Sequence, residues 1–207
     1  MSALYSQLES MIRKEVALPA DFWNELYECG EVICLKKGDF LLRQGEVCRH
    51  GYFLNRGSLI QLFQNENGKE IVLGFYIDHV YSFLSSPNSY FYHTGAIFEI
   101  RALEECELLA FSRECLEKLA NRFAPFSLFY HKITANALHN MYLYSAMRLS
   151  MSAEEFLNYL ISRQPEIMRR IPDKYIARFI GVSDEWLCKV KKKAFFPKKD
   201  IDLPNLN

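Results

Sequence analysis

Four lysines lie within five positions near the C-terminal end of the sequence, at residues 189 and 191–193. Lysines at one end of a helix suit a helix that enters the major groove of DNA, because their ammonium groups neutralise phosphates. Two acidic residues, Asp184 and Glu185, precede them. A carboxylate repels phosphates, yet it also accepts a hydrogen bond from cytosine N4. The predicted DNA-contacting residues are Ser183, Asp184, Glu185, Trp186, Lys189, Lys191, Lys192 and Lys193.

The residues around this cluster predict two short helices joined at Gly181. The first helix is expected from about Asp173 to Ile180, and the second from about Asp184 to Lys193 with Ser183 as its N-cap. Gly181 adopts a positive φ without steric cost, so the chain can turn sharply there. Small or apolar residues have the spacing that two crossed helices need: Ile176, Ala177, Ile180, Val182, Leu187 and Val190. This pattern favours a helix-turn-helix over a helical hairpin with a solvated basic end.

The sequence has no arrangement of residues that is typical of catalysis or of metal binding. The five histidines are dispersed, and there is no glycine-rich phosphate loop and no G-x-S-x-G elbow. The six cysteines contain no C-x-x-C pair, so we expect free thiols at Cys29, Cys34, Cys48, Cys106, Cys115 and Cys188. The prediction is therefore no enzyme activity, no metal and no resident cofactor, with an unknown effector.

The charge is balanced overall but uneven along the chain. Lysine plus arginine equals aspartate plus glutamate, at 25 each, so net charge does not indicate nucleic acid. Basic residues outnumber acidic ones between Arg163 and Lys199, which is typical of a separate DNA-binding module. Met1–Asp21 lacks a signal-sequence pattern, and no long uncharged apolar run appears elsewhere. We therefore expect a cytoplasmic protein that does not contact membranes.

The first half of the chain has short runs of apolar, branched and aromatic residues. Two short helices divided by Pro19 are expected before these runs, within Ser2–Tyr27. Turn residues at Gly38, Gly45, Gly57 and Gly68 separate the runs, which predicts a small antiparallel barrel or roll. The runs are residues 32–35, 40–42, 51–54, 58–63, 71–77, 95–102 and 106–111. Tyr81–His93 breaks this rhythm, and we expect it to form a loop over the opening of the roll.

Residues 36–59, KKGDFLLRQGEVCRHGYFLNRGSL, resemble the first half of a cyclic-nucleotide-binding-type β-roll. The likeness rests on Gly38-Asp39, on Gly45-Glu46 seven residues later, and on Tyr52-Phe53 leading to Gly57. Together with the helix-turn-helix at the other end, the chain resembles the Crp/Fnr family of bacterial transcription regulators. The likeness covers roughly residues 30–193.

This resemblance implies an α+β fold. We expect an N-terminal antiparallel β-roll (a double-stranded β-helix) with flanking helices in residues 1–122, a long dimerisation helix in residues 123–149, and a winged-helix-like helix-turn-helix domain in residues 150–207. The tail Ala194–Asn207 shows no clear strand pair, so the wing is expected to be reduced. The implied function is a homodimeric, sequence-specific transcription regulator that binds a palindromic operator in double-stranded DNA, with RNA polymerase as a further partner. The alternative is a ligand-binding or protein-interaction module whose helix-turn-helix has decayed.

The long helix carries one formal charge, Lys132, between Phe123 and Met147. A helix so poor in charge must be covered by other protein surface. One stripe has the alternating spacing of a coiled-coil seam, with Asn140 as a polar position that could fix the register. Its residues, the predicted dimer interface, are Phe126, Tyr130, Ile133, Ala137, Asn140, Tyr144 and Met147. The same stripe could pack on the chain's own roll, and we expect it to do both.

The resemblance does not extend to the residues that hold a cyclic phosphate in the family's nucleotide sensors. Their Arg-Ser or Arg-Thr pair corresponds to Ala96-Ile97 here, and their Gly-Glu-Leu turn is missing near Tyr81–Leu84. An unpaired buried phosphate charge costs several kcal/mol. We therefore predict that the roll does not respond to cyclic AMP, and that it takes a neutral or apolar effector or none. The candidate effector residues are Tyr81, Phe83, Ser85, Tyr90 and Arg101.

Overall fold

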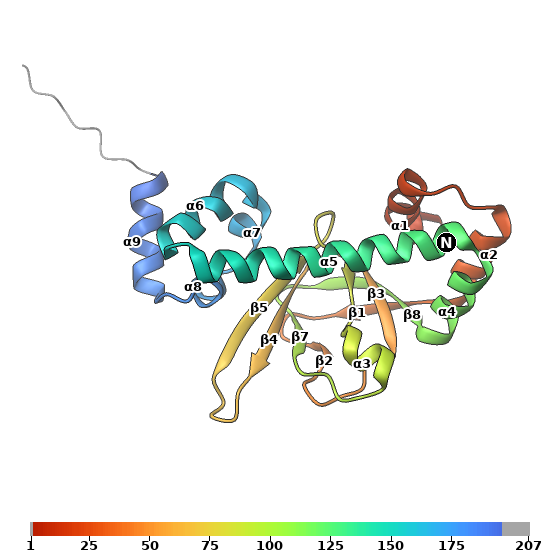
Figure 1. The fold of residues 1–207 in the computed structure, drawn as a ribbon, viewed down its shortest axis with the longest axis horizontal. Helices are drawn as coiled ribbons and strands as arrows, with labels where there is room; N and C mark the ends of the chain where they lie inside the picture. The colour runs from red at the N-terminus through yellow and green to blue at the C-terminus, as the bar shows by residue number, and fades with distance from the viewer. Residues whose placement is uncertain (1, 196–207) are drawn as a thin grey trace, which may run out of the picture.

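The computed structural model describes residues 2–195, which form a β-roll with helices at both ends (Figure 1). The first two residues of the predicted tail, Ala194 and Phe195, end the last helix, and the rest of the tail with any reduced wing lies outside the described residues. The helices are α1 (Ser2–Glu15), α2 (Ala20–Cys29), α3 (Pro87–Tyr92), α4 (Arg113–Arg122), α5 (Ala124–Ser150), α6 (Ala153–Arg163), α7 (Pro165–Arg170), α8 (Asp173–Ile180) and α9 (Asp184–Phe195). The strands are β1 (Gly30–Leu35), β2 (Phe40–Leu42), β3 (His50–Arg56), β4 (Ser58–Gln64), β5 (Glu70–Ile77), β6 (Phe83–Leu84), β7 (Glu99–Ala102) and β8 (Cys106–Ser112).

The roll consists of two four-stranded antiparallel sheets, ordered β1-β8-β3-β6 and β2-β7-β4-β5. Its turns fall where the sequence predicts them, and the predicted α+β fold class is confirmed. Gly57 shows why one of these turns needs glycine: its φ is +112°, and a Cβ atom there would lie 2.5 Å from the Cys106 sulfur. The segment Tyr81–His93, predicted as a loop, contains the short strand β6 and the short helix α3.

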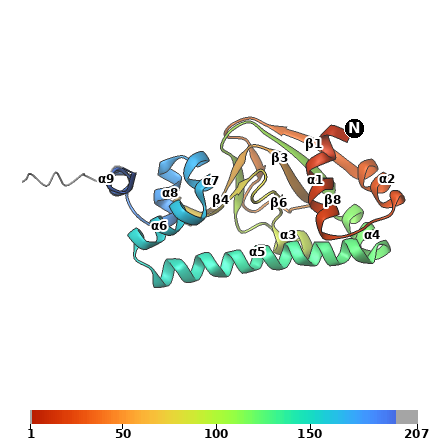
Figure 2. The same cartoon turned by 90° about the horizontal axis from the view of Figure 1, so that it is seen from above.

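A first apolar core fills the roll and continues into the N-terminal helices. It includes Leu54 and Leu108 from the paired strands β3 and β8, and Phe22 and Phe126 from α2 and α5. These side chains are almost completely buried. The amphipathic helices α1 and α2 therefore close one end of the roll, as Figure 2 shows beside α4.

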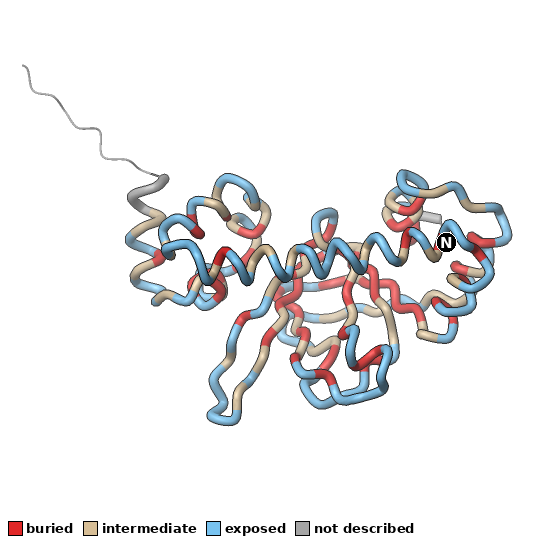
Figure 3. Tube along the Cα trace, viewed as in Figure 1, coloured by how far each residue is buried: buried red, intermediate tan, exposed pale blue. Residues whose placement is uncertain are grey.

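A second apolar core lies outside the roll, between the β4–β5 hairpin and the C-terminal helices. Ile60, Leu62 and Phe75 from the hairpin join residues of α6, α8 and α9 such as Leu157 and Phe179 in this core. Strand β4 is therefore buried on both faces, because Leu59 lies in the first core and Ile60 in the second. Figure 3 colours the buried residues of the chain red. This core includes residues on both sides of the predicted domain boundary at 149/150.

The long helix α5 connects the two cores. It has 27 residues, so it is about 40 Å long. Figures 1 and 2 show it running along the roll from the N-terminal helices to the C-terminal ones. It ends before Ser152, whose side chain forms the predicted capping box with Glu155 at the start of α6. The turn from α5 into α6 is thus specified locally.

One sequence-based expectation about the cysteines is wrong. Cys29 and Cys115 form a disulfide instead of two free thiols. Helix α2 packs on α4, which brings together residues that are 86 positions apart. Spacing along the sequence could not reveal this pair. The other four cysteines are free, as expected.

Removing the Phe179 ring should disrupt the second core. We expect Phe179→Ala to lower the free energy of unfolding by about 3–5 kcal/mol, because the ring is buried and the site cannot collapse fully. Phe91, which is 49% exposed, supplies the control, and Phe91→Ala should cost less than about 1 kcal/mol. Urea denaturation of the full-length protein measures both values. Equal losses for the two variants would contradict a packed second core.

Candidate nucleic-acid interface

Helices α8 and α9 and the turn between them form the helix-turn-helix that the sequence predicts. Gly181 has a φ of +92°, and the backbone amides of Gly181 and Val182 both donate to the carbonyl oxygen of Ala177, at 2.8 and 2.9 Å. Ser183 caps α9 by accepting a hydrogen bond from the Trp186 amide at 3.2 Å. The turn thereby satisfies the free backbone groups at the end of one helix and the start of the next.

The two helices cross at small and apolar residues. Ile176 and Ala177 on α8, and Leu187 on α9, have no exposed surface. Ala177 allows the backbones to approach closely, and Leu187 fills the space beside it. This packing fixes which side of α9 faces solvent.

The solvent-facing side of α9 carries Ser183, Asp184, Glu185, Cys188 and Lys189. Hydrogen bonds from its own backbone amide and from Ser183 lower the pKa of Glu185. This carboxylate is therefore ionised and held in the first turn of the helix. Glu185 and Lys189 are one turn apart on this face, so one acceptor and one donor point outward together.

The remaining predicted DNA-contacting residues are placed differently. Lys191 donates to Asp173 at 2.6 Å, so its charge is paired within the helix-turn-helix. Trp186 is half-buried against the second core. Lys192 and Lys193 continue α9, but their side chains lie outside the described residues.

Aromatic contacts attach the helix-turn-helix to the roll. The Phe179 ring on α8 lies 5.1 Å from the Phe75 ring on β5 and 5.6 Å from the Tyr144 ring on α5. The guanidinium of Arg148 lies 4.2 Å from the centre of the Phe179 ring and donates to two backbone carbonyls of β5. Burial lowers the pKa of Arg148. Residues of β5 and α5 thus hold one face of α8.

Two ion-pair groups border these contacts. Arg170 at the end of α7 donates to Asp78 and to Glu104, the latter at 2.6 Å. Its hydrogen bond to Asp78 raises the pKa of Arg170. Asp78 also accepts from the Gly57 amide at 2.6 Å, so this nearly buried carboxylate has several partners.

The second group is centred on Glu70 of β5. It accepts from Arg178 of α8 at 2.8 Å and from Arg101 of β7 at 3.0 Å. These side chains are partly exposed, so the pairs are screened by solvent and orient the helices more than they stabilise them.

The predicted dimer seam on α5 faces the chain itself. Phe126 belongs to the first core and Met147 to the second, and both are almost fully buried. Tyr130, Ile133, Asn140 and Tyr144 are half-buried, and Ala137 is exposed. The half of the expectation that placed this stripe against its own roll is therefore confirmed at Phe126, whereas Met147 packs in the second core.

A second stripe on the opposite side of α5 is exposed along its whole length. It has the same alternation of three- and four-residue steps, and it ends in Leu149, which is 89% exposed. Its residues are Leu128, His131, Ala135, Leu138, Tyr142, Ser145 and Leu149. Sequence reasoning missed this stripe, although its heptad spacing was visible in the sequence.

Two of the predicted effector residues lie outside the roll. Arg101 pairs in register with Ile60, which belongs to the second core, so both side chains point away from the roll interior. Tyr81 shares a hydrogen bond with Tyr144 at 3.1 Å, beside the second core. The expected placement of Arg101 and Tyr81 in an effector pocket is therefore wrong.

The other predicted effector residues lie nearer the roll interior. Phe83 packs between Phe53 and Phe129, with ring centres 5.0 and 5.7 Å away. Tyr90 is 2% exposed, and burial raises its pKa. Ser85 is half-buried just before α3.

The position that corresponds to the phosphate-binding arginine holds Ala96, which is 3% exposed. Its backbone amide donates to Glu46 and its carbonyl accepts from Gly45, both at 2.8 Å. Its methyl group offers no charge to a phosphate. A polar pair on the β4–β5 hairpin is neutral: the Tyr76 hydroxyl donates to the Gln61 amide oxygen at 3.4 Å.

Comparisons with known proteins agree with this architecture. Residues 32–123 match the model of the cyclic nucleotide-binding domain. No curated protein sequence matches the chain significantly. Within residues 2–195, no helix is both long and apolar enough to cross a membrane.

Three solved structures are similar over most of their length. FixK2 from Bradyrhizobium japonicum has a TM-score of 0.68 at 13% identity, covering 80% of this chain and 84% of that one. The c-di-GMP-responsive global regulator CLP from Xanthomonas campestris has a TM-score of 0.63 at 17% identity, covering 86% and 92%. A crp/fnr-family protein from Eubacterium rectale has a TM-score of 0.63 at 15% identity, covering 86% and 84%. Residues 32–123 are therefore similar to the cyclic nucleotide-binding domain, and the chain as a whole has the fold of these solved structures, which include a crp/fnr-family protein.

Proposed function

We propose that this protein is a homodimeric, sequence-specific DNA-binding transcription regulator that acts in the cytoplasm and has no enzymatic activity. The observation that carries the proposal is the solvent-facing side of α9, where Glu185 and Lys189 stand one turn apart on a capped and packed helix. A glutamate accepts from cytosine N4 and a lysine donates to guanine, so this pair can read a base step in the major groove. RNA polymerase is the further partner that such a regulator needs.

The operator follows from the dimer. Two recognition helices related by a two-fold axis occupy successive major grooves when they lie about 34 Å apart. A palindromic site in double-stranded DNA has that symmetry. The overall neutral charge of the chain implies that affinity depends on the few lysines of α9 and on base contacts.

The exposed stripe of α5 supports dimerisation. Leu128, Leu138, Tyr142 and Leu149 leave an apolar surface uncovered along one side of a helix. Their heptad spacing suits an identical helix crossing at a shallow angle. We therefore propose this stripe as the dimer interface, in place of the stripe from Phe126 to Met147.

The effector is the least specified part of the proposal. The roll carries no cation at the Ala96 position and has tyrosine hydroxyls at Tyr76 and Tyr90. These features favour a neutral effector, or an unliganded scaffold, over a cyclic nucleotide.

DNA recognition is tested by titrating the protein against a library of random duplexes at moderate salt. We expect a palindromic site to be enriched. Lys189→Glu should weaken binding to that site at least tenfold, and Glu185→Gln should relax selection at one cytosine, at a cost of about 1–3 kcal/mol. Lys37→Glu makes the same charge change on an exposed roll residue and should leave selection unchanged. If no palindrome is enriched and neither α9 variant alters DNA affinity, the decayed interaction module is favoured instead.

Dimerisation is tested by placing charges on the exposed stripe. We expect Leu138→Glu combined with Tyr142→Glu to dissociate the dimer, because like charges would meet across the two-fold axis. The control is Asn136→Glu, an exposed position about 160° around the helix from Leu138, which should leave the dimer intact. Sedimentation velocity separates the two species. A native monomer would refute the proposal directly.

Cyclic nucleotides should not bind the roll. Calorimetry with cyclic AMP and with cyclic GMP should give no saturable heat at micromolar concentrations, because no charge compensates the phosphate near Ala96. Adenosine, which lacks the phosphate, is the matched neutral ligand. A micromolar dissociation constant for either cyclic nucleotide would show that the charge argument is wrong.

A further inference from the structure

We propose that Cys29 and Cys115 form a reversible thiol–disulfide site that reacts with low-molecular-weight disulfides and thiols, and that its oxidation fixes the base of α5. The two residues are the last of α2 and the third of α4, and their Cα atoms are 6.3 Å apart. This separation lies within the range of about 4.4–6.8 Å that disulfides use. The pair can therefore close without moving the helices.

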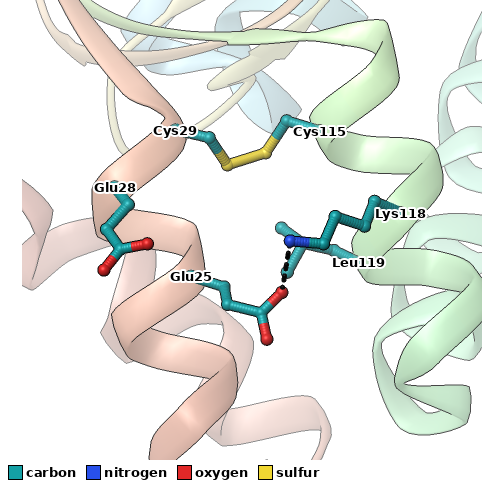
Figure 4. Close-up of a pocket in the computed structure, with 6 residues that line it drawn as sticks. All are labelled: Glu25, Glu28, Cys29, Cys115, Lys118 and Leu119. Carbon is teal, nitrogen blue, oxygen red and sulfur yellow. Dashed lines mark ion pairs between the residues drawn. A yellow bond between two sulfur atoms is a disulfide. The ribbon is translucent and has the colours of Figure 1, made fainter.

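A small cavity borders this pair, in which Cys29 is half-buried and Cys115 is 9% exposed. It has a volume of about 120 Å³ and is lined by the two cysteines together with Glu25, Glu28, Lys118 and Leu119 (Figure 4). Two of the lining residues, Lys118 and Glu25, form an ion pair at 3.1 Å. Disulfides that small thiols can reach exchange more readily than those enclosed in a core.

The surroundings assign different roles to the two sulfur atoms. Cys115 lies in the first turn of α4, where its amide donates to the Ser112 hydroxyl at 3.2 Å. A helix N-terminus favours the thiolate, and Lys118 adds a cation on the next turn. Cys115 is thus the attacking sulfur, and Cys29 on the facing helix resolves the intermediate.

The four other cysteines lack this combination. Burial raises the pKa of Cys48 and that of Cys106, the latter to about 11, so both stay protonated. Cys34 and Cys188 are exposed and free. Among the cysteines that the structure describes, the pair at 29 and 115 alone both has a cysteine partner and lines this cavity.

The reaction is a thiol–disulfide exchange in two steps. The Cys115 thiolate attacks a disulfide RSSR, which forms a mixed disulfide and releases RS⁻. The Cys29 sulfur then attacks the Cys115 sulfur and expels the second RS⁻. The two protons of the dithiol end on the two leaving thiolates, so the products are one protein disulfide and two RSH. Excess thiol reverses both steps.

Closing the disulfide affects α5 because α2 contacts the start of that helix. The Phe22 ring on α2 lies 5.3 Å from the Phe123 ring and 4.9 Å from the Phe126 ring. Phe123 directly follows α4 and is the N-cap of α5. Reduction leaves α2 and α4 joined by apolar packing and by ion pairs of Arg122 with Asp21 and Glu25 and of Lys118 with Glu25, whose cations are at least half exposed. The first turns of α5 should then open more often.

The test equilibrates the full-length protein in a series of glutathione to glutathione disulfide ratios, quenches with acid, and alkylates after denaturation. We expect a two-electron transition between six alkylated cysteines and four, with peptide mapping placing the bond at Cys29 and Cys115. Cys29→Ser should stop at the mixed disulfide on Cys115, whereas Cys34→Ser should leave the transition unchanged. A pair that stays reduced at every ratio, or stays oxidised in excess dithiothreitol, would overturn the proposal.

Hydrogen exchange measures the effect on α5 without requiring DNA. Oxidation should slow exchange of the amides in residues 123–133 at least threefold, and the double variant with serine at both positions should match the reduced protein. Equal exchange in both states would overturn the link to α5. The consequence for assembly rests on the proposed function, and we expect the oxidised dimer to dissociate at least threefold less readily in sedimentation. If both states are monomers while alkylation and exchange respond as expected, the proposed dimer fails and the thiol site stands.

Discussion

Strand β4 carries apolar side chains on both faces, and this constraint determines where the C-terminal helices lie. Leu59 faces the interior of the roll, while its neighbour Ile60 faces outward into the second core. Exposed apolar surface is unfavourable by about 25 cal/mol per Å², so the outer face of the β4–β5 hairpin needs a cover. Helices α6 to α9 provide it. The orientation of α8 and α9 therefore depends on a sheet that belongs to the roll.

The polar contacts around this cover have a different role from the apolar ones. The aromatic cluster of Phe75, Tyr144 and Phe179 supplies the burial. The ion pairs of Arg170 and Arg178 lie beside this cluster: the pair of Arg170 with Asp78 is largely buried, whereas the pair of Arg178 with Glu70 is partly exposed and screened by solvent. Glu70 binds both Arg101 of β7 and Arg178 of α8, so these two ion pairs connect strand β7 to the helix-turn-helix.

Local signals in the sequence predict the local structure well. The helix-turn-helix with its glycine turn and the capping box at Ser152 are confirmed. Each depends on residues within one or two helical turns of one another. Contacts between residues far apart in the chain could not be predicted from the sequence. The pair Cys29–Cys115 joins positions 86 residues apart. The two stripes of α5 have the same heptad spacing, and the absence of charge from both left no means to tell the inward one from the outward one. The direction of Arg101 depends on its register with Ile60, which a single strand does not reveal.

The length of α5 gives it the mechanical properties of a lever. Its first turns contact helices α2 and α4, and its last turn leads through Ser152 into α6. For a rigid rod of about 40 Å, a tilt of about 5° at one end moves the other end by roughly 3.5 Å. Met147 in the second core and the hydrogen bonds of Arg148 to β5 hold the far end of the helix, so such a tilt requires the second core and the β4–β5 hairpin to move with it.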